Sequence, residues 1–123
     1  MAITSAKDLL FKTIDEIGTL YRRKEVSPVE VTKATLERLD ELEPKLNAFI
    51  TVLAEAALKK AQEAEAVFLK GEAVGKLYGV PVSIKDIFNT RGIKTTLGSR
   101  ILHNHVPDED AYLDRRICLC HGM

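Results

Sequence analysis

The most informative part of the sequence is residues 75–86, which read Gly75-Lys76-Leu77-Tyr78-Gly79-Val80-Pro81-Val82-Ser83-Ile84-Lys85-Asp86. Its residues 78–84 carry no charge and include β-branched types, which favours a strand covered on both faces. Pro81 cannot donate to a ladder, so the strand is expected at an edge or with an irregular start. Lys85 ends this apolar run, where loss of hydration would disfavour an ammonium and allow the amine to act as a base. The open alternative is a lysine that leaves the strand end and pairs with Asp86 in solvent.

Two capping-box patterns precede predicted helices upstream of this stretch. Thr13-Ile14-Asp15-Glu16 places a hydroxyl three residues before a carboxylate and predicts a helix over about residues 14–23. Ser27-Pro28-Val29-Glu30 repeats the pattern with proline at the first helical position. Pro44 then limits how far this second helix can run.

The remaining elements are a strand, a helix and a loop. Residues 47–53 are rich in β-branched and aromatic types and predict a strand. Residues 54–70 predict a helix whose inner face is formed by small and apolar residues. Gly71 is the expected C-terminal cap, because glycine adopts the left-handed conformation without steric cost. Residues 90–99 are polar and glycine-containing and are expected to form a loop. The inner-face residues of the helix are Ala54, Ala57, Leu58, Ala61, Ala64 and Phe68.

The composition describes an ordinary globular chain of 123 residues. Eighteen basic and eighteen acidic side chains cancel, so no global charge favours nucleic acid or acidic lipid. The longest uncharged run, Leu46–Ala54, is about half the length that a membrane span requires. Residues 1–12 lack the apolar block of a signal peptide. These observations favour a soluble, cytoplasmic, single-domain α/β protein.

Several short motifs follow one another along the chain, and both their residues and their order are informative. They are Glu43-Pro44-Lys45-Leu46-Asn47-Ala48-Phe49, the block at residues 75–86, Thr95-Thr96 with Gly98-Ser99, and Val106-Pro107 with Asp110-Ala111. Over about residues 13–111, the sequence resembles the N-terminal portion of the amidase-signature family. The resemblance implies a mixed central sheet flanked by helices, with three to four helices and about two strands in this chain. We expect residues 1–123 to form a single partial domain of that family, with residues 112–123 as an unrelated tail.

The resemblance also implies a chemistry. Members of the family cleave a carboxamide with a Ser–Ser–Lys triad and need no metal or organic cofactor. By this resemblance Lys85 is the catalytic base, held neutral so that it accepts the proton of the nucleophile. The two catalytic serines are expected further along, in a Gly- and Ser-rich stretch that the sequence does not contain, and neither Ser83 nor Ser99 matches them. We therefore interpret the chain as a truncated or frame-shifted product that is inactive alone.

Three alternatives stay open. The family includes the A subunit of the tRNA-dependent Asp/Glu amidotransferase, which works with partner subunits, although we favour a stand-alone amidase acting on a small-molecule amide. A hypothesis of another class is a non-catalytic interaction fragment that self-associates, because an isolated pair of strands leaves edges open. A zinc site is the weakest alternative, because its donor spacing differs from that of known zinc motifs. Its donors would be His103, His105, Cys118, Cys120 and His121.

Overall fold

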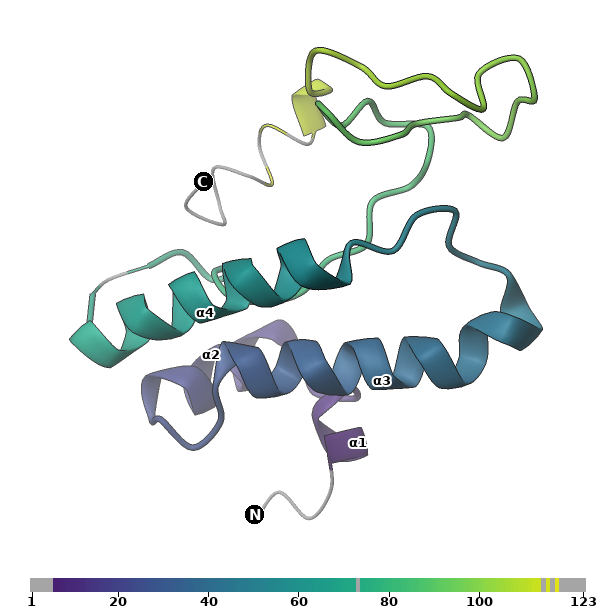
Figure 1. The fold of residues 1–123 in the computed structure, drawn as a ribbon. Coiled ribbons are helices and arrows are strands. Elements are labelled where there is room, and N and C mark those ends of the chain that lie inside the picture. Colours follow the sequence, from purple (N-terminus) through teal and green to yellow (C-terminus); the bar gives the residue numbers. More distant parts are fainter. Residues whose placement is uncertain (1–5, 73, 114, 116, 118–123) are drawn as a thin grey trace. The chain divides into compact units, whose positions relative to one another are not determined.

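The computed structural model describes residues 6–72, 74–113, 115 and 117. The chain divides into two compact units, a first unit (Met1–Pro81) and a second unit (Val82–Met123). The labelled helices of Figure 1 all belong to the first unit. They are α1 (Ala6–Leu9), α2 (Ile14–Arg22), α3 (Pro28–Leu46) and α4 (Ala54–Lys70).

Both predicted capping boxes are confirmed. At the start of α2, the Thr13 hydroxyl accepts from the Glu16 amide at 3.3 Å, and the Thr13 amide donates to the Glu16 carboxylate at 2.7 Å. At the start of α3, the two corresponding bonds between Ser27 and Glu30 measure 3.2 and 2.8 Å. Each box satisfies two amides that the first helical turn would otherwise leave unpaired.

The predicted helix ends are also close to the observed ones. Pro44 lies in the last turn of α3, which stops two residues later at Leu46. Asn47 then adopts a left-handed conformation, and its amide donates to the carbonyl of Glu43. Gly71 caps α4 with a φ of 74°, as its position in the sequence predicted.

The Ser27 cap provides a stability prediction. We expect Ser27→Ala to lower the free energy of unfolding by about 1 kcal/mol, because the Glu30 amide loses its acceptor. Urea denaturation followed by far-UV circular dichroism measures the change, with the exposed Thr51→Ala as the matched control. An equal effect of both substitutions would contradict a specific role for the cap.

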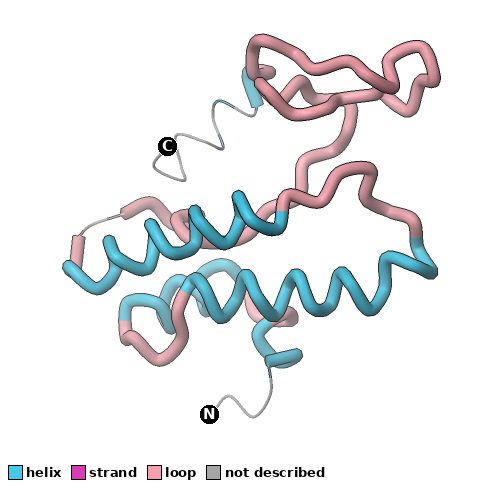
Figure 2. The backbone as a smooth tube through the Cα atoms, viewed as in Figure 1, coloured by secondary structure: helices cyan, strands magenta, loops and turns pink. Residues whose placement is uncertain are grey.

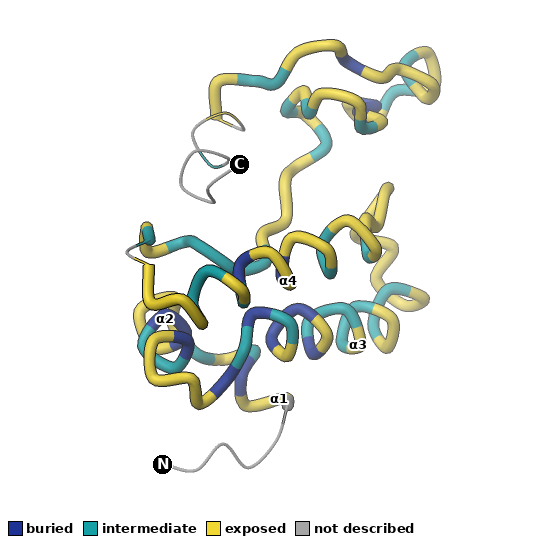
Figure 3. Tube along the Cα trace, turned by 60° about the vertical axis from the view of Figure 1, so that its left-hand side comes forward, coloured by how far each residue is buried: buried dark blue, intermediate teal, exposed yellow. Residues whose placement is uncertain are grey.

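The core of the first unit is centred on α2. Its buried members come from α1, from α2 and from the residues that begin α3, and side chains of α4 and the following turn pack against them. Figure 3 shows the buried positions of α3 and α4 as dark segments, and these two helices pack on one another. Ala61 and Ala64 are the buried residues of α4, which confirms the inner face expected from the sequence. The core residues are Leu9, Ile17, Tyr21, Val26 and Val31, with Leu20, Phe68 and Val80 against them.

The predicted strands are wrong, and with them the predicted mixed α/β sheet. Residues 47–53 and 78–84 are neither helical nor paired in a ladder, and the part of the chain that the structure describes contains no strand (Figure 2). Their apolar, β-branched composition indicates surfaces suited to burial, but a strand also needs a neighbour that accepts and donates its backbone bonds. Phe49, Ile50 and Val82 instead remain between 43% and 54% exposed.

Gly79 is a local reason why residues 78–84 do not form a continuous strand. Its φ of 75° lies in the left-handed region, and the amides on either side close turns, from Tyr78 to Gly75 and from Val80 to Leu77. The turn also brings Gly79 onto the helices. A Cβ at this position would lie 3.0 Å from Pro28 and 3.3 Å from both Ala64 and Phe68.

The second unit is built mainly from turns and loops. Two backbone bonds hold the arms of a long loop together, one from the Gly92 amide to the Pro107 carbonyl at 2.9 Å and one from the Thr95 amide to the His105 carbonyl at 3.0 Å. Residues 90–99 form the loop that the sequence predicted, and residues 112 and 113 are helical.

Candidate active site

Lys85 lies near the beginning of the second unit. Its carbonyl accepts from the Phe88 amide at 3.0 Å, which closes a tight turn immediately after it. The Lys85 side chain is exposed, and the apolar side chains around it are partly exposed too, with Val82 at 50%, Ile84 at 38% and Ile87 at 50%. The structure thus places Lys85 in an exposed, apolar segment of the surface. Shielding of its amine from water by other parts of the enzyme stays a prediction.

Asp86, the next residue, accepts hydrogen bonds from three successive residues, 96–98. One carboxylate oxygen accepts from the Thr96 amide at 2.8 Å. The other accepts from the Thr96 hydroxyl and from the Gly98 amide, the latter at 3.2 Å. The main chain contributes as well, because the Asp86 carbonyl accepts from the Leu97 amide at 3.0 Å.

These bonds determine the charge state of Asp86. The hydrogen bond from the Thr96 hydroxyl, followed by the bond from its amide, lowers the pKa of the Asp86 carboxyl below its ordinary value, while partial desolvation opposes the shift. The carboxylate is therefore ionised at neutral pH. Among the described residues no ion pair joins Lys85 to Asp86, so the solvent pair considered from the sequence is not formed.

The loop that donates to Asp86 is tightly organised. Thr95 and Thr96 are 2% and 7% exposed, although both are polar. Leu97 and Gly98 have φ values of 53° and 67°, and in this left-handed conformation the Leu97 amide donates to the Asp86 carbonyl while the Gly98 amide donates to the Asp86 carboxylate. Sequence reasoning missed this arrangement. The available signal was an aspartate followed ten residues later by Thr-Leu-Gly, which combines a hydroxyl donor with a glycine suited to positive φ.

The zinc alternative has little support from the described residues. The His103 Nδ1 atom lies 2.9 Å from the Arg100 carbonyl, and the His105 carbonyl accepts from Thr95. The described portion of the chain contains no group of three or more histidine, cysteine or acidic side chains placed to hold a metal. The other proposed donors, Cys118, Cys120 and His121, lie outside the described residues.

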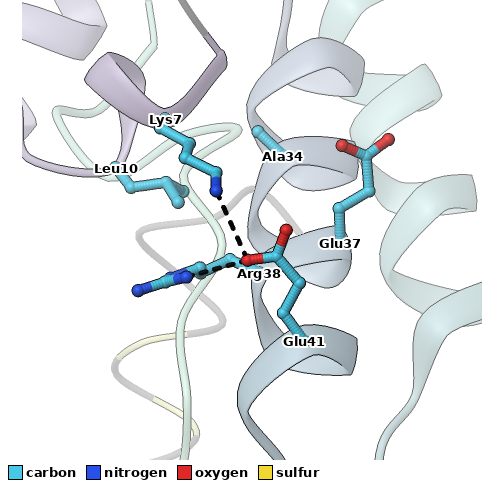
Figure 4. Close-up of a pocket in the computed structure, with 6 residues that line it drawn as sticks. All are labelled: Lys7, Leu10, Ala34, Glu37, Arg38 and Glu41. Carbon is cyan, nitrogen blue, oxygen red and sulfur yellow. Dashed lines mark hydrogen bonds and ion pairs between the residues drawn. The ribbon is translucent and has the colours of Figure 1, made fainter.

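A small pocket occurs in the first unit and is lined by residues of α1 and α3 and by Leu10 (Figure 4). The Glu41 carboxylate accepts a hydrogen bond from the Arg38 guanidinium at 2.8 Å and forms an ion pair with the Lys7 ammonium at 3.6 Å. The hydrogen bond from Arg38 is the main reason why the pKa of Glu41 is lowered. These groups are exposed, and exposed ion pairs contribute little to stability. The pocket contains no residue that the sequence predicted to be functional, so it is not the candidate active site.

None of the helices among the described residues is long and apolar enough to cross a membrane.

Comparison with known proteins identifies the family. A model of the family described as Amidase matches residues 30–118, a segment that includes Lys85 and Asp86. The glutamyl-tRNA(Gln) amidotransferase A subunit from Geotalea daltonii is 49% identical over 104 residues, and that from Carboxydothermus hydrogenoformans is 45% identical over the same length. Each match covers 85% of this chain and 21% of the relative. The chain thus spans about a fifth of the length of these relatives.

Solved structures agree with this assignment. A bacterial aryl acylamidase of the amidase-signature family matches 90% of the chain with a TM-score of 0.81 and 30% identity, and the match covers 24% of that enzyme. A fatty acid amide hydrolase matches 96% of the chain with a TM-score of 0.88 and 23% identity, over 21% of its length, which is a likeness of fold. Because the family match takes in more than half of the sequence, the chain belongs to the amidase family.

Proposed function

We propose that this chain is the segment of an amide-cleaving enzyme that supplies the general base, and that Lys85 is this base. The observation that carries the proposal is the family match over residues 30–118, which contains Lys85 within the block that resembles the amidase signature. The substrate class is a carboxamide, and the bond cleaved is its C–N bond.

The chemistry divides between Lys85 and groups supplied by the rest of the enzyme. A serine attacks the carboxamide carbonyl while its proton passes, through a second serine, to the neutral amine of Lys85. The same proton then protonates the leaving nitrogen, and water hydrolyses the acyl-enzyme that remains. Because only the neutral amine accepts a proton, Lys85 must be shielded from water. The exposed Ile84 and Ile87 beside it give the covering residues an apolar surface to pack on.

The curated relatives favour a particular branch of this function. The two bacterial amidotransferase A subunits are 45–49% identical to the chain, whereas the two amidases of known structure are 23% and 30% identical. We therefore prefer the role of an amidotransferase A subunit, with the released ammonia passed to an acceptor and with partner subunits, over the stand-alone amidase favoured by the sequence alone.

An exchange of segments tests the proposal. The 104-residue segment of the Geotalea daltonii protein that matches this chain is replaced by the corresponding residues of this chain, to give an exchange enzyme. We expect the exchange enzyme to release ammonia from a primary carboxamide, and the 123-residue chain alone to release none, because the base has no nucleophile to activate. A correctly folded exchange enzyme without turnover would contradict the proposal, as would turnover by the chain alone.

The interaction-fragment hypothesis is a second candidate, favoured by one observation. Residues 47–53 form no strand ladder within the described residues, and their apolar side chains are exposed, with Ile50 at 54% and Leu53 at 44%. An apolar segment without a partner strand can pair with another chain and so promote association. Self-association of the 123-residue chain stays a prediction, and size-exclusion chromatography tests it. A monomer at all concentrations would contradict it.

A further inference from the structure

We propose that Asp86 is a positioning residue for Lys85, and that it acts by fastening the main chain next to the base to the loop at residues 96–98. This inference rests on the proposed function, because it assumes that Lys85 is the base. It assigns a role in the reaction to a residue that does not itself exchange a proton with the substrate.

Hydrogen bonds hold Asp86 at more than one point. The Asp86 side chain accepts from Thr96 and Gly98, and its carbonyl accepts from Leu97. Residue 86 is thus tied at both its side chain and its main chain to three successive residues. A residue held at both points cannot rotate about its own backbone without breaking several bonds at once.

The hydrogen bonds that hold Asp86 do not involve the Lys85 amine. Within the described residues the Asp86 oxygens bind the loop and not Lys85. On the other side, the Lys85 carbonyl closes a turn with the Phe88 amide. The main chain around Lys85 is therefore fixed from both directions, while its long side chain keeps its reach. A general base must lie within hydrogen-bond distance of its proton, so a defined starting point for the side chain matters.

The loop that binds Asp86 has an unusual backbone conformation. Leu97 has a φ of 53°, an uncommon conformation for a residue with a branched side chain. The bond from its own amide to the Asp86 carbonyl and the adjacent bonds to the carboxylate hold it there. Strained residues of this kind persist where surrounding bonds define them, and they concentrate at functional sites.

Hydrogen exchange on the complete 123-residue chain tests the geometry. We expect Asp86→Ala to accelerate exchange of the Thr96 and Gly98 amides at least tenfold and to leave the amides of α3 and α4 unchanged. Asp110→Asn is the matched control, because Asp110 also accepts a loop amide, that of Arg91 at 2.6 Å, without contacting residues 96–98. Unchanged exchange at Thr96 in Asp86→Ala would overturn the proposal, and so would equal acceleration in the control.

Activity of the exchange enzyme tests the role. We expect Asp86→Ala to lower kcat by ten- to a hundredfold with KM within twofold, because a displacement of about 1 Å can cost about a hundredfold in rate. Asp86→Asn keeps one acceptor oxygen and should lie between Asp86→Ala and the parent, while Asp110→Asn should retain the parent kcat. If Lys85→Ala retains activity, the proposed function fails. If Lys85→Ala is inactive but Asp86→Ala keeps the parent kcat, or raises KM alone, only the positioning role is overturned.

Discussion

Tyr21→Ala is expected to lower the free energy of unfolding of the first unit by about 3–5 kcal/mol, the range for truncation of a buried aromatic side chain. Tyr21 is 1% exposed, the least among the buried hydrophobic residues of the core. Its ring lies 5.2 Å from that of Phe68, and its hydroxyl donates to the Gly79 carbonyl at 3.0 Å. The side chain thus connects α2 both to α4 and to the turn that follows it.

One further variant separates the contributions of the Tyr21 ring and hydroxyl, and a second, at Tyr112, is the exposed control. Tyr21→Phe removes only the hydroxyl and should cost about 1 kcal/mol, the net value of one hydrogen bond. Tyr112→Ala truncates a tyrosine that is 75% exposed and should change stability by less than about 0.5 kcal/mol. Urea denaturation followed by far-UV circular dichroism measures all three. A loss below about 1 kcal/mol for Tyr21→Ala would contradict the central place of this residue in the core.

The same phenol makes the stability of the first unit depend on alkaline pH. Burial raises the pKa of the Tyr21 hydroxyl above its ordinary value. The unfolded chain therefore releases this proton before the folded chain does as pH rises. The stabilisation is fully present below the unfolded value of about 10 and is lost progressively above it. Tyr21→Phe should remove this dependence.

The helices were predictable because their signals are local. The boxes at Thr13 and Ser27, the proline at position 28 and the glycine at position 71 act on the residues beside them, so a window of a few residues contains the whole cause. Pro44 was correctly placed near the end of its helix for the same reason. Only α1, a single turn, had no such signal and was not predicted.

The absence of strands from the described residues could not be predicted, because strand pairing is not local. Residues 47–53 have a composition suited to a sheet, but composition does not show whether a neighbour is present. Gly79 shows the same limit within residues 78–84. The sequence shows that residue 79 is a glycine, but it does not show that Gly79 forms a left-handed turn against Pro28 and Ala64. That turn depends on helices elsewhere in the chain.

The sequence pointed to one residue of the candidate site, Lys85, whose catalytic role stays a prediction. Lys85 could be singled out because it ends an apolar run within a block that resembles a known family. The hydrogen bonds to Asp86 could not be predicted from the sequence. Their donors, at Thr96 and Gly98, are ten and twelve residues away and reach Asp86 only because the loop folds back. The sequence therefore indicated the chemical group, while the structure shows how the main chain beside it is held.

Lys85→Ala in the exchange enzyme is expected to lower kcat by about a thousandfold, within the range for loss of a general base. This loss corresponds to about 4 kcal/mol of transition-state stabilisation. Lys85→Arg should be equally inactive, since a guanidinium keeps its proton in proteins and cannot accept another. The pair of variants therefore distinguishes proton transfer from a simple requirement for positive charge.

Lys76→Ala is the matched control for this loss. Lys76 belongs to the same sequence block, but it is exposed and pairs with Asp15 at 3.1 Å in the first unit. Its replacement should leave kcat within about twofold of the parent, as expected for an exposed ion pair. Initial rates of ammonia release give kcat and KM for each variant, and circular dichroism confirms that each is folded. If Lys85→Arg retained the parent rate, the amine would act through its charge alone, and cleavage of the amide would need another base.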